Sequence, residues 1–253
     1  MIIKNILNKV NIHFFYYFVA CVAILTGMFK EFIIFSSIII VHEMGHIVAS
    51  ICCRWNIERI IILPFGGLTI FKEHLNKPIK EELIILLSGP MFQIVFFFIY
   101  TSIFGINSIF NNYHYAILFF NLIPIFPLDG ARLINLFLNK FISFKNSHII
   151  TVYISFVIFT LLLIFTIVNK MNLLYILILV FLLIKVIDEH KKHSFIFNKF
   201  LFERYIYNFN FKKRKVINGN KITMMARDCK HLFYFNKKYH LEKEILRKKF
   251  DFH

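Results

Sequence analysis

The sequence has little cysteine, glycine, proline or acidic side chain. Its 253 residues include 4 cysteines, 8 glycines, 5 prolines and 14 aspartates and glutamates, against 30 lysines and arginines. None of the cysteines forms a CxxC pair, and three lie in or beside apolar runs, which argues against a disulfide framework. The C-terminal part has no glycine-rich loop of the kind that cradles phosphate.

What the chain has in excess is apolar surface and positive charge. Hydrophobic residues make up 58% of it, the mean hydropathy is +0.66 and the formal net charge is +16. Soluble domains contain roughly 45–50% apolar residues, so these values exclude an ordinary soluble domain. We predict a polytopic membrane protein. No small-residue cleavage site follows the first apolar run, which is therefore expected to remain as an anchor.

The fold class predicted from these runs is membrane all-α. We expect a bundle of six transmembrane helices, a small β-hairpin at the membrane surface, and a basic cytoplasmic tail with an α+β, CBS-like character. The predicted spans are residues 13–29, 32–53, 83–104, 113–131, 149–168 and 173–187. The predicted domains are a six-helix membrane domain at 1–189 and a C-terminal region at 190–253.

Basic residues in the short loops predict the orientation of these spans. With both termini in the cytoplasm, ten Lys and Arg residues lie in inner segments, and only Lys30 and Lys170 lie in outer turns. We therefore expect both termini to be cytoplasmic.

The second span carries three ionisable groups: His42, Glu43 and His46. A charged residue at the centre of a membrane helix costs about 2.5 kcal/mol or more, so such groups usually have a function. The two histidines are four residues apart and project from one helix face, within reach of a single ion. Glu43 occupies the position of the general base in an H-E-x-x-H metalloprotease. A solvated polar face is not available to these residues inside an apolar span.

The fourth span contains a second polar group in the run from Asn121 to Gly130. Two prolines, an asparagine and an aspartate make a regular helix unfavourable there, and broken backbone at membrane depth must be buried in protein or face a cavity. Asp129 is the best-placed carboxylate to complete a zinc site with the two histidines. The alternative is an interfacial ion pair between Asp129 and Arg132, which leaves the histidines unexplained.

The loop between the second and third spans predicts a hairpin at the inner membrane surface. Residues 55–71 contain two β-rich runs on either side of Pro64-Phe65-Gly66-Gly67. One interpretation is a structural cap on the helices. The other is an edge strand that pairs with an extended substrate, with Phe65 and Gly66 among the substrate-binding residues. Ser88, Gly89 and Pro90, at the start of the third span, indicate close helix packing.

These motifs together resemble the site-2 protease family of intramembrane zinc metalloproteases. The resemblance rests on His42-Glu43-Met44-Gly45-His46 and on Asn121, Pro124, Asp129 and Gly130 in an N-x-x-P-x-x-x-x-D-G arrangement. The stretch FNKFLFERY at 197–205 is similar to the sporulation branch of that family, and the likeness covers roughly residues 10–205.

The resemblance implies an activity and a set of residue roles. Zinc would be bound by His42, His46 and Asp129, with Glu43 as general base and with Asn121 and Pro124 near the substrate. The implied substrate is the pro-sequence of a sporulation sigma factor of the pro-sigma-K type. The implied location is the membrane around the forespore, on the mother-cell side. The resemblance also implies that membrane-bound inhibitory regulators control the cleavage.

The chain departs from the family in two ways. The family often has asparagine where this chain has Gln93. The sporulation branch carries a nucleotide-binding CBS domain, and the tail here is short for a complete one, so ATP at this region is only an expectation from resemblance.

The tail itself is strongly basic, with 17 Lys and Arg against 5 Asp and Glu in residues 190–253. A basic cluster at 212–215 lies beside Phe209 and Phe211, which suits anionic lipid headgroups. Nucleic acid is a weaker interpretation because no recognised motif is present. The sequence leaves open whether the chain forms homo-oligomers.

Two other functional classes are compatible with the same ligands. A metal transporter or sensor would bind the ion without hydrolysis. An inactive membrane scaffold would need neither the ion nor hydrolysis. The variant Glu43→Gln separates them, because a protease would retain zinc and lose cleavage, whereas a transporter would keep its function.

Overall fold

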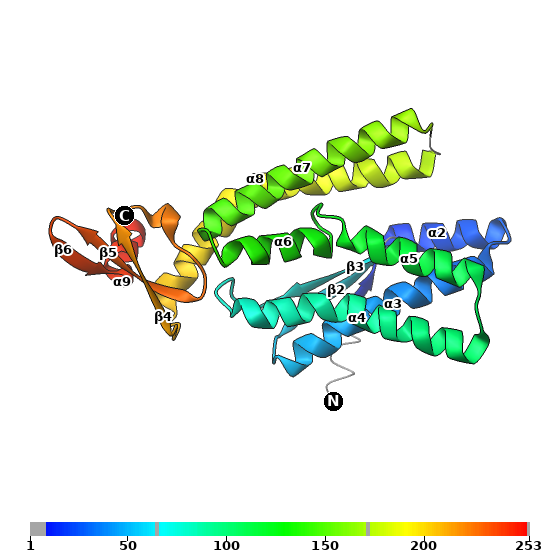
Figure 1. Cartoon of the computed structure of the whole chain (residues 1–253), viewed down its shortest axis with the longest axis horizontal. Coiled ribbons are helices and arrows are strands. Elements are labelled where there is room, and N and C mark those ends of the chain that lie inside the picture. Colours follow the sequence, from blue (N-terminus) through cyan, green and yellow to red (C-terminus); the bar gives the residue numbers. More distant parts are fainter. Residues whose placement is uncertain (1–8, 64–65, 171–172, 252–253) are drawn as a thin grey trace. The chain divides into compact units, whose positions relative to one another are not determined.

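The computed structural model describes residues 9–63, 66–170 and 173–251 (Figure 1). The chain divides into two compact units. The first holds the chain up to Glu73 together with Glu81–Leu122, and the second holds His74–Lys80 together with the chain from Ile123 onward. Helix α4, Ile79–Phe104, begins in the second unit and continues through the first.

A three-stranded sheet lies in the first unit. Strands β2, Ile57–Leu63, and β3, Gly66–Phe71, form an antiparallel hairpin, which confirms the predicted one. Strand β1, Val10–Ile12, pairs in parallel with β2 and was not predicted. The order β1-β2-β3 leaves β3 at one edge of the sheet.

The helices of the first unit are mostly apolar. Besides α4 they are α2, Phe14–Leu25, α3, Phe29–Cys52, and α5, Ser108–Leu122. Helix α3 packs against α5 through a fully buried cluster that includes Ile38, Ile39 and Phe110. Aliphatic and aromatic side chains on the facing sides of these helices bury each other and so fix the position of α3.

The second unit contains the remaining helices and a second sheet. Helices α7, Phe144–Val168, and α8, Leu173–Ile206, run side by side, and the short helix α6 covers Asp129–Asn139 (Figure 1). A three-stranded sheet follows: β4, Lys213–Asn218, β5, Cys229–Phe235, and β6, Lys238–Leu241. The turn η1, Ile222–Met224, and helix α9, Glu242–Phe250, complete the unit.

The C-terminal sheet has a core of its own, which also anchors the end of α8. Phe200 and Leu201 of α8 pack with Phe233 of β5 and Leu246 of α9, all of them fully buried. This core gives the C-terminal region the expected α+β character. Helix α8 passes without a break through residue 189, and the domain boundary placed there stays a prediction.

Three of the six predicted spans are matched by helices of sufficient length and apolar character, and the six-span layout stays a prediction. Within the described residues, three helices are long and apolar enough to cross a membrane, namely α3, α4 and α7. In the predicted span at 13–29, helix α2 has 12 residues, roughly 18 Å at 1.5 Å per residue, and ends at Leu25 before α3 begins at Phe29. The predicted span at 113–131 is interrupted, because α5 ends at Leu122 and α6 begins at Asp129. The prolines in between account for that break.

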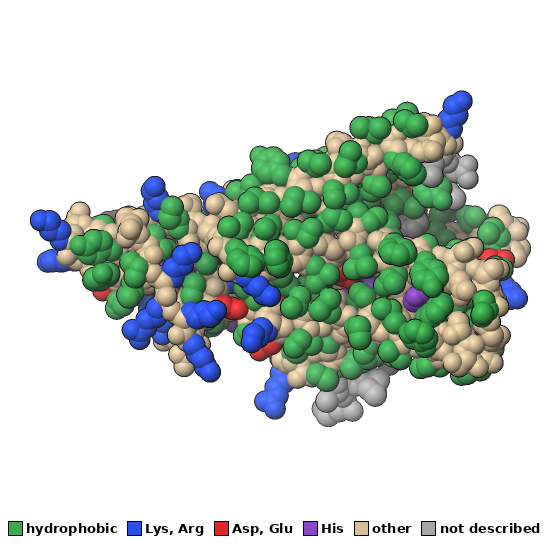
Figure 2. Space-filling model, in the orientation of Figure 1, with side chains coloured by type: hydrophobic (Ala, Val, Ile, Leu, Met, Phe, Trp, Pro, Cys, Tyr) green, Lys and Arg blue, Asp and Glu red, His purple; other side chains and the backbone are tan. Residues whose placement is uncertain are grey.

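The surface of the second unit changes character along its length (Figure 2). Hydrophobic side chains cover α7, including the exposed Tyr153, Val157 and Leu161. Lysine and arginine side chains gather over the C-terminal sheet, where β4 exposes residues 213–215. An apolar helical surface next to a basic one is typical of a membrane protein with a domain at the lipid headgroups.

Candidate metal centre

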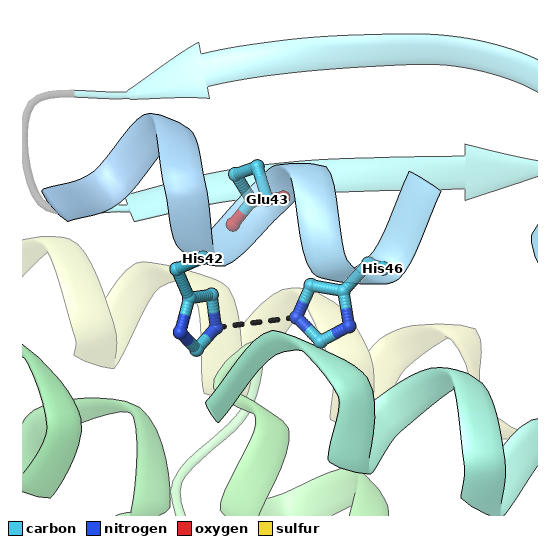
Figure 3. A group of neighbouring side chains, drawn as sticks. All are labelled: His42, Glu43 and His46. Carbon is cyan, nitrogen blue, oxygen red and sulfur yellow. Dashed lines mark hydrogen bonds between the residues drawn. The ribbon is translucent and has the colours of Figure 1, made fainter. Parts of the chain in front are cut away.

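Helix α3 brings His42 and His46 together on one side (Figure 3). Their Nε2 atoms are 3.2 Å apart, and His42, Glu43 and His46 are buried, each of these residues being 7% exposed or less. One ligand atom from each of the three lies within 4.8 Å of the others. The i, i+4 spacing that predicted a shared ion therefore produces the expected convergence.

Helix α4 orients both imidazole rings through their Nδ1 atoms. The Nδ1 of His42 lies 2.9 Å from Oε1 of Gln93, and the Nδ1 of His46 lies 2.8 Å from the carbonyl oxygen of Ile85. The amide nitrogen of Gln93 donates to the carbonyl of His114 at 2.9 Å, which fixes the direction of the amide. Both Nδ1 atoms thus face oxygen acceptors and must carry the hydrogen.

The consequence is that the two Nε2 atoms, turned toward each other, are the atoms that the two rings would offer to a metal ion. Zinc ligands at about 2.0–2.1 Å in a tetrahedron place two nitrogens about 3.3 Å apart, close to the observed 3.2 Å. The residues present therefore fit a zinc ion.

Two glycines permit this close approach of α3 and α4. A Cβ atom at Gly89 would lie 2.3 Å from Nε2 of His46 and 2.9 Å from Nε2 of His42. A Cβ atom at Gly45 would lie 2.4 Å from the backbone oxygen of Ser88. The predicted packing role of the Ser88-Gly89 step is confirmed, and Gly89 also leaves open the space in front of both nitrogens.

Glu43 lies in contact with the hairpin. Its Oε1 accepts a hydrogen bond from the backbone N–H of Gly67 at 3.0 Å, and its Oε2 lies 3.4 Å from the hydroxyl of Thr69. Gly67 and Thr69 both belong to β3. The hairpin therefore contacts the carboxylate that the sequence singles out as general base.

The predicted substrate-binding residues lie in different places. Asn121 is buried in the last turn of α5, and a Cβ atom at Gly66 would lie 3.7 Å from its Oδ1. Pro124 belongs to the second unit, where its carbonyl accepts a hydrogen bond from Ser155 at 3.2 Å. Phe65 lies outside the described residues. Gly66 and Asn121 are thus neighbours within the first unit, and the substrate role of all four stays a prediction.

Asp129 is the first residue of α6, in the second unit, whereas both histidines belong to the first. The structure brings together His42, Glu43 and His46, and the part of Asp129 as third ligand stays a prediction. Sequence reasoning did not assign Gln93, Ile85 or Thr69 a place at the site. A buried amide inside an apolar span was the available signal for Gln93.

Comparison with known proteins gives consistent matches. Residues 30–117 match the description of peptidase family M50. The chain is 31% identical to stage IV sporulation protein FB of Bacillus subtilis over 96% of this chain and 83% of that protein. It is 30% identical to a zinc metalloprotease of Methanocaldococcus jannaschii over 46% of this chain and 36% of that protein. The solved site-2 protease from the same archaeon superposes with a TM-score of 0.55 at 24% identity, over 71% of this chain and 89% of the other.

Proposed function

The chain belongs to peptidase family M50, the site-2 proteases, and from this membership we propose that it hydrolyses a peptide bond of a membrane-associated protein at the His42–His46 centre. Members of the family are metalloendopeptidases with apolar helices. This chain has three helices that are long and apolar enough to cross a membrane, within the described residues. The observation that carries the proposal is the pair of Nε2 atoms turned toward each other at 3.2 Å by oxygens of α4.

In the proposed reaction, His42 and His46 would hold a zinc ion, which would supply a Lewis acid for the scissile carbonyl and a lowered pKa for a water molecule. Glu43 accepts the proton of the attacking water and later delivers it to the leaving amine. The apolar spans around the centre exclude bulk water. A helical substrate must unwind first, because its peptide bonds are hydrogen-bonded and shielded.

We assign Asp129 as the third protein ligand. Two imidazoles alone leave a catalytic zinc short of the three protein ligands that such sites have. Asp129→Ala should lower the zinc content of the purified chain and abolish cleavage, whereas Arg132→Ala should leave zinc bound. If Asp129→Ala keeps a full complement of zinc, the third ligand is another group.

The proposed substrate is a sigma-factor precursor of the pro-sigma-K type. Similarity to stage IV sporulation protein FB over nearly the whole chain supports this choice. Asn121, Pro124, Phe65 and Gly66 are proposed to hold the extended substrate. We also propose that both termini are cytoplasmic and that the chain lies in the membrane around the forespore.

The proposed partners follow from the same similarity and from the charge of the tail. They are membrane-bound inhibitory regulators and, at the basic C-terminal surface, anionic lipids. The comparisons do not support binding of a nucleotide by the C-terminal region, and we do not propose it. We do not propose a homo-oligomer either.

The decisive experiment co-expresses the full chain with a pro-sigma-K-type precursor and follows cleavage by immunoblot. The wild type should release the shortened sigma factor, Glu43→Gln should bind zinc without cleaving, and His42→Ala should do neither. Intact precursor with a well-expressed wild type would overturn the proposal. If Glu43→Gln cleaved as well as the wild type, hydrolysis with Glu43 as base would be excluded.

A further inference from the structure

The hairpin strand β3 is in direct contact with the proposed general base. The backbone N–H of Gly67 donates to Oε1 of Glu43 at 3.0 Å, and the Thr69 hydroxyl lies 3.4 Å from Oε2. Glu43 and Thr69 are 7% and 6% exposed, so neither depends on bulk water for its hydrogen bonds. Each carboxylate oxygen therefore has its own partner on a single strand.

The absence of a side chain at residue 67 makes this contact feasible. A Cβ atom there would lie 2.2 Å from Cδ, 2.4 Å from Cγ and 2.6 Å from Oε2 of Glu43. Real Cβ contacts are not this short, so any other residue would push the carboxylate away from the strand. Glycine at this position has a steric reason that is independent of turn geometry.

We infer that β3 is a positioning strand for the general base, with Gly67 and Thr69 as positioning residues. A glutamate has three rotatable side-chain bonds, and a base that moves away from the attacking water loses rate steeply. Two donors from a strand that is itself paired with β2 restrict the carboxylate to one orientation. Hydrogen bonds to a buried ionised carboxylate also stabilise it where water is scarce.

This inference rests on the proposed function and changes how the hairpin is understood. The strand-addition hypothesis treats the edge of β3 as free for a substrate. Here the Gly67 N–H on that strand is already used by Glu43. A substrate strand that paired at Gly67 would have to displace the base, so we expect substrate to avoid this residue of β3.

The test uses the purified full chain in lipid vesicles with a pro-sigma-K-type precursor, and measures kcat, KM and bound zinc. Thr69→Val removes the hydroxyl at nearly constant shape and should lower kcat about fivefold, with KM within about twofold and zinc unchanged. Thr69→Ser restores the hydroxyl and should restore kcat. Thr101→Val is the matched control, because that hydroxyl bonds only within α4, to the Phe97 and Phe98 carbonyls.

Gly67→Ala should have the larger effect, about a hundredfold in kcat, with zinc retained. Thr69→Val keeps the inference falsifiable if Gly67→Ala fails to fold. If Thr69→Val had the wild-type kcat and KM, the positioning role of β3 would be overturned. A raised KM with unchanged kcat would also overturn it, because β3 would then be a substrate-binding strand. A wild type that leaves the precursor intact would overturn the proposed function and this inference together.

Discussion

Two buried polar clusters in this chain look alike in composition and differ in how their hydrogen bonds are satisfied. One is the His42–Glu43–His46 centre in the first unit. The other surrounds Arg204 in the second unit, with His231, Glu242 and Asn76. Both combine histidine with an acidic side chain in an apolar setting, and a search by residue type alone would treat them equally.

In the Arg204 cluster the polar groups satisfy one another. The guanidinium donates to Oδ1 of Asn76 at 2.6 Å, to the carbonyls of Cys229 and Ala226 at 2.9 Å each, and to Glu242 at 3.1 Å. Its Cζ atom lies 4.8 Å from the ring centroids of Phe200 and Phe211. A buried cation with this many acceptors is typical of a structural site.

His231 in the same cluster is likewise engaged on both ring nitrogens. Its Nδ1 lies 3.1 Å from Glu242, and its Nε2 accepts the backbone N–H of Ala226 at 3.0 Å. At the metal centre the partners of Nδ1 on α4 instead turn the two Nε2 atoms toward each other, 3.2 Å apart. Hydrogen-bond direction, rather than residue identity, therefore separates the metal site from the structural cluster.

The largest effect that would test this contrast is expected from Gly89→Ala. The new methyl would occupy the space in front of both Nε2 atoms, so zinc binding and cleavage should both be lost. Zinc content of the purified chain and cleavage of the precursor measure the two effects. Ser102→Ala in the same helix is the control, because that hydroxyl bonds to the Phe98 carbonyl. A zinc-loaded Gly89→Ala chain would show that the ion lies elsewhere.

Arg204→Met should instead destabilise without affecting the metal. Removing one member of a buried ion pair typically costs about 3–5 kcal/mol, because the remaining carboxylate and carbonyls lose their partner. The urea midpoint for tryptic cleavage of the C-terminal region in the full chain should fall markedly. Arg214→Met, on an exposed position of β4, is the matched control and should change little. Loss of zinc with unchanged stability would contradict the structural assignment of this cluster.

The sequence predicted those parts that depend on short-range patterns. The spacing of His42 and His46 gave one helix face, and Pro64 with Gly66 gave the hairpin between β2 and β3. The prolines after Asn121 gave the interruption between α5 and α6. Each of these signals lies within about ten residues of chain, where backbone geometry and residue type are enough.

The parts that were missed depend on distant contacts. Gln93 reaches His42 across 51 residues, and Arg204 reaches Asn76 across 128. The last span was predicted at residues 173–187, whereas helix α8 continues to Ile206. Lysine and glutamate in the added part are good helix formers, and the Phe200 end is held by the C-terminal core. Burial of that end, which no local pattern reveals, decides the length of the helix.

At the metal centre, Gln93→Leu should lower the affinity for zinc, a smaller effect than those above. Loss of a partner behind a metal-binding histidine commonly lowers metal affinity about 10- to 100-fold. Zinc competition with a chelator measures this directly. Gln93→Glu keeps an oxygen acceptor for Nδ1 of His42 and should retain more affinity than Gln93→Leu. Equal affinities in the two variants would mean that the contact does not hold the ring.

The smallest expected effect is a pH dependence confined to the Arg204 cluster. Burial lowers the pKa of His231 below its usual 6.5, so the unfolded region binds a proton that the folded one does not, and stability falls as the pH drops below about 6.5. Burial alone would raise the pKa of Glu242, but the His231 hydrogen bond and the Arg204 charge hold this pKa below its usual 4.5. Protonation of Glu242 in more acidic solution therefore causes a further loss of stability. Tryptic protection of the C-terminal region in urea should therefore be weaker at pH 5.5 than at pH 7.5. The difference should shrink in His231→Gln, and greater protection at the lower pH would contradict a neutral buried His231.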